Sequence, residues 1–308
     1  MHTTENYPCI AVLMATHNGM NWIQEQLDSI LNQQDVAVTI YISDDRSSDG
    51  TRDFIDKLSQ SDSRIVLLSK TVATGSAGYN FYRLIIDVSL DGFDYFAFAD
   101  QDDIWHLDKL IRHAGLIKDH QAAAVSSNVV AFWQGGDERL IVKSQPQRTL
   151  DFLFESAGPG CTFLMTPWLL ARVREQLMEA NSKARLIALH DWLTYAVCRS
   201  YGAKWIIDAT PSVHYRQHSN NVLGANVGFM AKFTRLVKFQ QGWYRAEVLK
   251  ISQVCAVISE DPRIQSISQW VASKSILSNI MLLRIVGMTR RSIIDRLVLA
   301  LCFAIFIF

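Results

Sequence analysis

The chain has 308 residues, of which 49% are hydrophobic and 19% are charged. These proportions exclude an intrinsically disordered protein and predict a globular chain with a sizeable core, one large domain and an appendage. The 30 basic and 30 acidic residues cancel, but residues 229–308 hold 11 Lys/Arg and 4 Asp/Glu, a net charge of +7, which leaves −7 on residues 1–228. The acidic front argues against nucleic acid as a partner.

Strands and helices alternate through the first hundred residues. Short apolar runs predict four strands, at Ile10–Ala15, Val38–Ile42, Ile65–Leu68 and Tyr95–Ala99. Apolar residues at helical spacing follow the first strand, the segment Asp49-Gly50-Thr51 and the glycine-bearing loop Thr74–Gly78. Such alternation predicts a parallel sheet that is covered by helices.

The second half of the chain is mixed. Its apolar runs predict strands at Ala122–Trp133, Leu140–Val142, Gly160–Thr166, Trp205–Ile207 and Val213–His218, and helices after Pro167 and from His190. From Phe229 onward the sequence is helical and basic. The predicted fold is therefore α/β, a Rossmann-like mixed and mostly parallel sheet flanked by helices, with a C-terminal helical region beyond a boundary near Gly224–Gly228.

The cysteines and the ends of the chain bear on its location. The five cysteines, at positions 9, 161, 198, 255 and 302, are widely spread and include no CxxC pair. We therefore expect neither a zinc site nor a disulfide framework, and a reducing cytoplasm is favoured. The first residues lack the apolar stretch of a signal peptide. The apolar segment Leu297–Phe308 is only about 12 residues long, too short to span a bilayer.

Three carboxylates, those of Asp100, Asp102 and Asp103, follow the strand that ends at Ala99. Carboxylates this close repel one another unless a cation neutralises them, and Mg²⁺ or Mn²⁺ prefers oxygen ligands. The carboxyl ends of parallel strands are also where open α/β sheets bind their ligands. The pattern predicts a site for a metal and a diphosphate, and an acidic loop that merely follows a strand is the alternative.

Two other predicted strands also end in polar side chains, Thr16 and Asn18 after the first and Asp44 and Asp45 after the second. We expect these groups to share one ligand crevice, although Asn and Asp also favour turns for local reasons. The sequence has no GxxxxGK[ST] motif, no GxGxxG motif and no serine-centred nucleophile elbow. Phosphate handling is therefore expected to depend on a metal.

Two further segments carry candidate chemistry. Asp191 could act as a general base toward a sugar hydroxyl, and a helix N-cap is the alternative role. In Val213–His218 the two-residue period of a strand places His214, Arg216 and His218 on one face. That face could ligate a metal and bind diphosphate oxygens, or it could be a polar solvent face.

Together these segments resemble the family 2 glycosyltransferases of the GT-A fold, and most closely the bacterial branch often described as rhamnosyltransferases. The resemblance extends in order over about residues 8–225 and rests on five segments. They are Ala15-Thr16-His17-Asn18-Gly19, Ser43-Asp44-Asp45-Arg46-Ser47-Ser48-Asp49-Gly50-Thr51, Asp100-Gln101-Asp102-Asp103, His190-Asp191-Trp192 and Tyr215-Arg216-Gln217-His218-Ser219-Asn220-Asn221.

The resemblance implies a GT-A domain over residues 7–225, with a nucleotide-binding half (7–105) and an acceptor half (106–225). It also implies an inverting enzyme that uses a nucleotide-diphosphate sugar and Mg²⁺ or Mn²⁺. On the donor side, Thr16 and Asn18 would line the nucleotide pocket, and Asp44 or Asp45 would accept a hydrogen bond from N3–H of uracil or thymine. Asp100 would contact the ribose or sugar, Arg216 would also bind the nucleotide sugar, and Asp102 and His218 would hold the metal.

On the acceptor side, the resemblance implies that Asp191 is the catalytic base. Gly160, Cys161 and Thr162 would form the acceptor-side loop, with His190 and Trp192 beside the base. The implied reaction is a single in-line displacement in which the deprotonated acceptor hydroxyl attacks the anomeric carbon.

The basic region 226–308 suggests a second task. Its cations are interleaved with apolar residues, and they are Lys232, Arg235, Lys238, Arg245, Lys250, Arg284, Arg290, Arg291 and Arg296. Basic amphipathic helices bind anionic membrane surfaces, and a lipid-linked glycan acceptor would need such a surface. We therefore expect a cytoplasmic protein, peripheral to the cytoplasmic face of the inner membrane. Packing on the catalytic domain or a homo-oligomer contact is the alternative.

The expected function is transfer of a sugar from dTDP-rhamnose, or from a UDP-sugar, to a hydroxyl of a lipid-linked glycan in cell-surface polysaccharide (O-antigen or capsule) synthesis. A metal-dependent nucleotidyltransferase is one alternative, but it usually carries a glycine-rich, lysine-bearing loop that this sequence lacks. A non-catalytic assembly scaffold is another, and the carboxylates present in every motif count against it.

Overall fold

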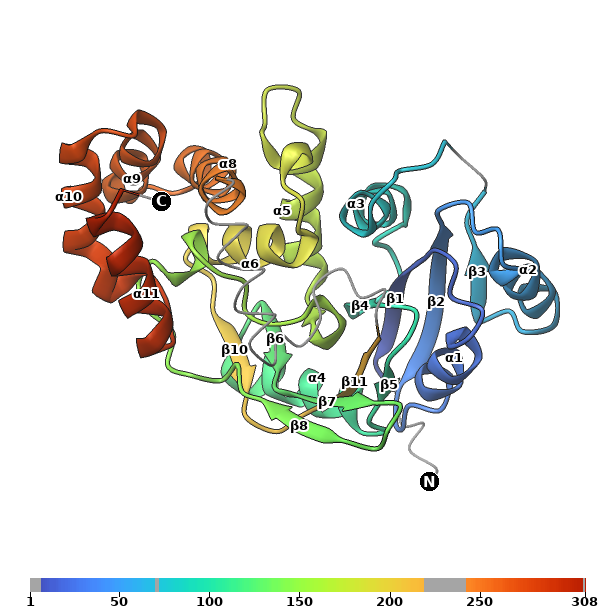
Figure 1. Cartoon of the computed structure of the whole chain (residues 1–308). Coiled ribbons are helices and arrows are strands. Elements are labelled where there is room, and N and C mark those ends of the chain that lie inside the picture. Colours follow the sequence, from blue (N-terminus) through green and yellow to red (C-terminus); the bar gives the residue numbers. More distant parts are fainter. Residues whose placement is uncertain (1–6, 70–71, 219–241, 307) are drawn as a thin grey trace.

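A seven-stranded sheet forms the centre of the computed structural model, which describes residues 7–69, 72–218, 242–306 and 308 (Figure 1). Strand β9 is antiparallel to both of its neighbours, β4 and β6, and the remaining pairs are parallel. The mostly parallel α/β sheet predicted from the sequence is thus confirmed. In spatial order the strands are β3 (Ile65–Leu67), β2 (Ala37–Asp44), β1 (Cys9–Thr16), β4 (Tyr95–Ala99), β9 (Leu164–Met165), β6 (Ala124–Ser127) and β10 (Trp205–Asp208).

Helices cover both faces of this sheet. Alternate residues of β1 belong to different apolar clusters, Val12 to one and Leu13 to the other. The Val12 cluster includes residues of α1 (Ile23–Leu31), α2 (Thr51–Ser61) and α4 (Lys109–His120). The Leu13 cluster includes residues of α3 (Ala77–Asp87), α5 (Pro167–Met178) and α6 (His190–Ser200). Because the central strands are buried on both faces, they read as unbroken apolar runs.

A second, smaller sheet lies beside the first and determines where the site forms. Its strand order is β5 (Ile104–Trp105), β11 (Val213–Gln217), β7 (Val129–Trp133) and β8 (Glu138–Ile141). Strand β11 pairs with β5, which follows the acidic loop after β4. This pairing brings the end of β11 next to residues about 110 positions earlier in the chain, as in the hydrogen bond from Arg216 N to Asp103 Oδ1 (3.1 Å).

Two predicted strands differ in the structure. The run Ala122–Trp133 divides at Asn128 into β6 and β7, which belong to different sheets. The Asn128 side chain causes the break, because it accepts hydrogen bonds from Lys143 N (2.6 Å) and Ser144 N (3.0 Å) and donates to Ala209 O (2.7 Å).

The segment Gly160–Thr166 begins as a 3₁₀ turn, η2 (Gly160–Thr162), before the two-residue strand β9. Thr162 donates its hydroxyl and its backbone N–H to Pro159 O, which closes the turn. Helix α4 was not predicted. Its buried face includes Lys109 and His113, which interrupt the apolar period that would have revealed the helix.

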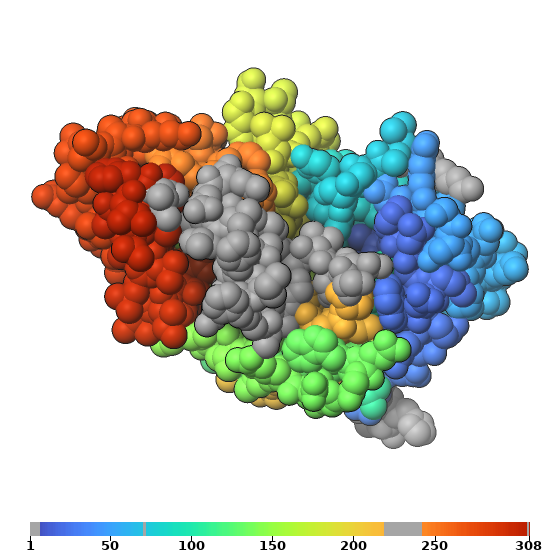
Figure 2. Space-filling view, in the orientation of Figure 1, coloured from blue at the N-terminus to red at the C-terminus, as the bar shows by residue number. Residues whose placement is uncertain are grey.

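In the part of the C-terminal region that the structure describes, from residue 242 onward, four α-helices lie at the opposite end of the molecule from α2 (Figure 1, Figure 2). They are α8 (Trp243–Ile258), α9 (Pro262–Ser273), α10 (Ile276–Ile285) and α11 (Ile293–Ala304). The apolar cluster that contains Trp192 of α6 continues through Val248 of α8 to Leu299 and Phe303 of α11. Among the described residues, no helix has the length and apolar character needed to cross a membrane.

The predicted boundary near Gly224–Gly228 and the cations Lys232, Arg235 and Lys238 lie outside the described residues. Two of the described cations, Arg290 and Arg291, bond within the protein where the sequence predicted an outer basic stripe. Arg291 pairs with buried Asp151 (3.2 Å) and donates to Ser156 O (2.6 Å), and Arg290 pairs with Glu155 (3.6 Å).

Arg245 and Lys250 are directed inward too. The Arg245 guanidinium donates to the carbonyls of Val271 (2.8 Å), Trp270 and Phe308, and Lys250 pairs with buried Glu247 (2.5 Å). These cations satisfy backbone carbonyls and carboxylates of the packed helices, which is a structural role.

Candidate active site

Side-chain contacts join the loop after β4 to the end of β11. Asp102 Oδ2 lies 2.8 Å from His218 Nε2, and the His218 ring stacks on Trp22 with 4.1 Å between centroids. Arg216 donates its Nε–H to the backbone oxygen of Asp102 (2.7 Å) and forms an ion pair with Glu25. The residues predicted as metal ligands, Asp102 and His218, are therefore brought together, and Arg216 lies beside them.

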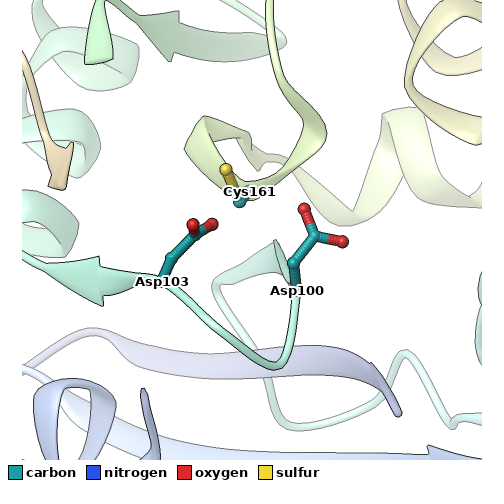
Figure 3. A group of neighbouring side chains, drawn as sticks. All are labelled: Asp100, Asp103 and Cys161. Carbon is teal, nitrogen blue, oxygen red and sulfur yellow. The ribbon is translucent and has the colours of Figure 1, made fainter. Parts of the chain in front are cut away.

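Asp100 and Asp103 form a second group with Cys161, in which one ligand atom from each lies within 4.8 Å of the others (Figure 3). Asp103 and Cys161 are buried, and Lys109 Nζ donates to Cys161 O (2.8 Å). Burial holds the pKa of the Cys161 thiol well above its ordinary value. A protonated thiol is a poor ligand for Mg²⁺ or Mn²⁺, so this group is not itself the expected oxygen-ligand site.

Electrostatics of the acidic loop favour a bound cation. Burial, with the charges of Asp102 and Asp191, raises the pKa of Asp100 to about 7. Burial also raises the pKa of Asp102, against the opposing effect of His218, and it raises that of Asp103 well above its usual range. Carboxylates that are desolvated and crowded in this way ionise fully when a divalent cation offsets their repulsion. The carboxylate of Asp102 and the imidazole of His218, 2.8 Å apart, are donor types that fit Mg²⁺ or Mn²⁺.

Asp191 occupies the first turn of α6, where it accepts a hydrogen bond from Trp192 N (2.7 Å). The Ser156 side chain, whose Oγ donates to Gly158 O (3.1 Å), favours the ionised form of this carboxyl and so lowers its pKa. Burial raises the pKa of Asp191 to about 6, although the hydrogen bonds and the charge of Lys143 act in the opposite direction. A carboxylate with this pKa is ionised at neutral pH yet more basic than an ordinary aspartate, which suits a general base.

The predicted acceptor-side loop contacts the start of α6. A Cβ added to Gly160 would lie 2.7 Å from His190 Nε2 and 3.3 Å from Asp191 Cβ, so the close approach requires glycine. His190 stacks on Phe81 (3.7 Å between centroids), and burial lowers its pKa to about 3, which keeps the ring neutral. Trp192 is directed away, because its Nε1 donates to Phe152 O (2.9 Å) inside the core.

On the nucleotide side, Thr16 and Asp44 are partners across β1 and β2. Asp44 Oδ2 accepts hydrogen bonds from Thr16 Oγ1 (3.1 Å) and Ser47 Oγ (2.5 Å), and its Oδ1 accepts from Ser47 N (3.1 Å). Asn18, at φ 49°, adopts a left-handed conformation; its backbone N–H donates to Ser47 Oγ (2.8 Å) and its side-chain Oδ1 accepts from Ser48 N (2.8 Å). These bonds tie the first two strand ends together.

Asp45 is held by a different segment. Its two carboxylate oxygens accept hydrogen bonds from the backbone N–H groups of Thr74 (2.5 Å) and Gly75 (2.9 Å). His17 Nδ1 lies 2.8 Å from the backbone oxygen of Asp45. Thus the first, second and third strand–helix connections meet at this edge of the sheet.

Comparisons with known proteins place the chain. A sequence profile described as "Glycosyl transferase family 2" matches residues 11–166. The "dTDP-rhamnosyl transferase RfbG" of Shigella flexneri is 43% identical over 244 residues, which cover 79% of this chain and 84% of that protein. The chain belongs to glycosyl transferase family 2.

Two further similarities of this family 2 glycosyltransferase are weaker. The "UDP-Glc:alpha-D-GlcNAc-diphosphoundecaprenol beta-1,3-glucosyltransferase WfgD" of Escherichia coli is 30% identical over 49% of this chain and 57% of its own length. Among solved structures, S. aureus TarS 1–349 in complex with UDP-GlcNAc aligns with a TM-score of 0.57 at 13% identity, over 91% of this chain and 83% of that one. That likeness supports the GT-A fold and, at this identity, nothing further.

Several residues around the glycosyltransferase site were not predicted. Gln101 exchanges two hydrogen bonds with the His17 backbone, at 2.8 and 2.9 Å, and so joins the acidic loop to the first strand end. Trp22 and Phe81 stack on the two histidines of the site, His218 and His190. No sequence signal distinguishes these aromatic residues from core positions of α1 and α3. His214, by contrast, is 4.7 Å from the His106 ring and does not join the group around Asp102.

Proposed function

We propose that this family 2 glycosyltransferase is inverting and metal-dependent, and that it transfers rhamnose from dTDP-rhamnose to a hydroxyl of a lipid-linked glycan in cell-surface polysaccharide synthesis. The single observation that carries the proposal is that the Gly160–Thr162 turn lies against both groups: the Cys161 thiol lies within 4.8 Å of an Asp100 carboxylate oxygen, and a Cβ added to neighbouring Gly160 would lie 3.3 Å from Asp191 Cβ. The diphosphate-binding and base functions therefore belong to one site. The similarity to a dTDP-rhamnosyl transferase supports rhamnose as the sugar.

For the donor, we assign the base N3–H to Asp45. The Asp45 carboxylate accepts two hydrogen bonds in the structure, one at each oxygen, whereas the Asp44 carboxylate accepts three, so Asp45 has more acceptor capacity left. Thr16 and Asn18 line the nucleotide pocket, and Asp100 and Arg216 contact the ribose, sugar or diphosphate. Asp102 and His218 would hold Mg²⁺ or Mn²⁺, which when bound neutralises charge on the leaving diphosphate.

For the acceptor, Asp191 accepts the proton of the attacking hydroxyl. Its hydrogen bond from Trp192 N holds Oδ1, so that the carboxylate keeps one orientation. The neutral His190 and the Gly160 turn shape the pocket beside the base. One carboxylate base is sufficient for a single displacement, which inverts the anomeric centre.

The acceptor assignment has a bearing on location. A glycan on a lipid carrier is presented at a membrane surface, so we place the enzyme in the cytoplasm, at the cytoplasmic face of the inner membrane. The name of the E. coli relative WfgD includes a diphosphoundecaprenol-linked sugar, which supports an acceptor of this class.

The test is donor turnover with purified protein and a membrane extract that contains lipid-linked acceptors. We expect dTDP release from dTDP-rhamnose in the presence of Mn²⁺ or Mg²⁺, little release after EDTA treatment, and slower turnover of UDP- and GDP-sugars. Asp191→Asn should lower kcat by at least about a hundredfold, whereas Asp119→Asn, an exposed carboxylate on α4, should leave it unchanged.

Three results would count against the proposal. Turnover by Asp191→Asn at the normal rate would contradict the assignment of Asp191 as the base. Full activity in EDTA would contradict the proposed dependence on a metal. Release of pyrophosphate in place of dTDP would favour the nucleotidyltransferase alternative, which the family match does not support.

A further inference from the structure

Helix α11 is apolar on its outer side. With 100° of rotation per residue, its exposed apolar side chains occupy a continuous arc of about 140° that contains no polar residue. These side chains are between 47% and 68% exposed. They are Ile293, Ile294, Leu297, Val298 and Leu301.

The charged residues of α11 lie outside this arc. Asp295 pairs with Arg290 (3.2 Å), and Arg296 Nη1 donates to the backbone oxygens of Arg290 (3.0 Å) and Arg291 (3.4 Å). A helix on the surface of a water-exposed domain has the opposite arrangement, with charge outward. The outer side of α11 is therefore adapted to an apolar environment.

Helix α10 packs against α11 (Figure 1). It too has polar side chains turned inward and apolar side chains turned outward. Ser278 and Asn279 are buried, at 6% and 4% exposure. Four apolar side chains are exposed instead, by 38% to 68%, namely Ile276, Leu277, Ile280 and Leu283. We call the exposed apolar side chains of α10 and α11 the apolar face. Isolated exposed apolar residues are ordinary, but nine on two packed helices form a patch of the kind that marks an interaction surface.

The charge around the apolar face indicates which kind of partner it binds. The segment 274–306 contains five cations and one carboxylate, and that carboxylate, Asp295, is paired with Arg290. Two of the cations, Lys274 and Arg284, are exposed. An anionic lipid surface complements such a surround, whereas a symmetric contact with a second copy would place two positively charged segments together.

We propose that the apolar face is a membrane-inserting surface that embeds in the headgroup–acyl boundary of an anionic bilayer. This inference rests on the proposed transfer to a lipid-linked acceptor and identifies the part of the chain that reaches the lipid. Helix α11 has 12 residues and is about 18 Å long, well short of a hydrocarbon core of about 30 Å, so it lies in the plane of the interface. Apolar insertion supplies most of the attachment, and Arg284 and Lys274 contact headgroups.

Vesicle flotation of the full chain tests the proposal. We expect the protein to float with vesicles of phosphatidylethanolamine and phosphatidylglycerol and to float less well with phosphatidylcholine vesicles. Leu297→Gln with Leu301→Gln should lower the vesicle partition coefficient by about a hundredfold, about tenfold for each lost leucine. Val257→Gln is the matched control, because Val257 is 83% exposed but belongs to α8, so its partition should be unchanged.

Because the substituted side chains are exposed, the variants should fold, and equal thermal midpoints would verify this. Ile276→Gln with Ile280→Gln on α10 gives a second, independent variant with the same expected direction. Normal flotation of both double variants, or failure of the unaltered protein to float, would overturn the proposal. So would a dimer, detected by light scattering, that the α11 substitutions convert to a monomer without changing flotation.

Flotation requires no donor or acceptor, so its result stands even if the sugar-transfer assay fails. Conversely, the α11 double variant should turn over a water-soluble acceptor analogue at the rate of the unaltered protein and lose turnover only on acceptors embedded in vesicles. Equal loss on both acceptors would show that α11 supports the fold of the site and would contradict a membrane role.

Discussion

Asp191→Asn should stabilise the folded protein while it removes activity. Because burial sets the pKa of Asp191 near 6 when folded, against 3.8 in an unfolded chain, ionising this group costs the folded state about 3 kcal/mol more. Asparagine resembles the neutral acid in size and can still accept the hydrogen bond from Trp192 N. The substitution removes the ionisation cost.

The sign of the effect follows from the raised pKa. Below about pH 3.8 the carboxyl is protonated in both states, so no cost exists, and the cost grows until the pH exceeds about 6. We therefore expect Asp191→Asn to increase the free energy of unfolding by about 1 kcal/mol at pH 4.5 and about 3 kcal/mol at pH 8. At pH 8 the thermal midpoint should rise by about 5 °C or more.

Urea denaturation without nucleotide or metal, repeated between pH 4.5 and pH 8, measures this difference, with Asp119→Asn as the exposed control. The same ionisation should produce an acidic limb near pH 6 in kcat/KM of the unaltered enzyme, because only the carboxylate accepts a proton. A gain in stability that does not change with pH, or a loss at pH 8, would refute the reasoning.

Three other substitutions, with Gly115→Ala as a comparison, test separate parts of the structure. Asp102→Asn should weaken Mn²⁺ binding at least about tenfold in calorimetric titration with dTDP present, and unchanged affinity would exclude it as a ligand. Gly160→Ala must displace His190, so urea denaturation should show a loss of about 1–3 kcal/mol and kinetics a higher acceptor KM. Gly115→Ala on α4, where a Cβ meets open space, should instead stabilise by about 0.5–1 kcal/mol. Asp151→Asn leaves buried cations uncompensated and should cost about 3–5 kcal/mol of unfolding free energy; a cost below about 1 kcal/mol would contradict this role.

The parallel core of the fold could be predicted because its strands are buried on both faces. The run Tyr95–Ala99 was recognised as a strand for this reason, and it became β4. The second sheet could not be predicted, since β5 has two residues and the break at Asn128 depends on side-chain bonds to distant loops. Helix α4 was missed because the buried Lys109 interrupts the apolar period on its inner face.

The motifs located the acidic group of the site, but its geometry required the fold. Neighbouring carboxylates at one strand end are visible in a sequence, whereas the pairing of Asp102 with His218 joins positions 116 residues apart. The sequence also could not predict whether the side chains of the C-terminal arginines point outward or into the protein. Cations spaced along a helix look alike whether they face lipid or, like Arg291, a buried carboxylate.

One connection between the C-terminal region and the reaction centre has a practical consequence. Arg291, just ahead of α11, donates to the backbone oxygen of Ser156 (2.6 Å), whose side chain favours the ionised form of Asp191. Trimming the chain to a minimal sugar-transfer core would therefore remove a hydrogen bond that holds this segment near Asp191, the proposed base. Protein engineers who wish to shorten or fuse this enzyme should keep the sequence through Arg291 intact.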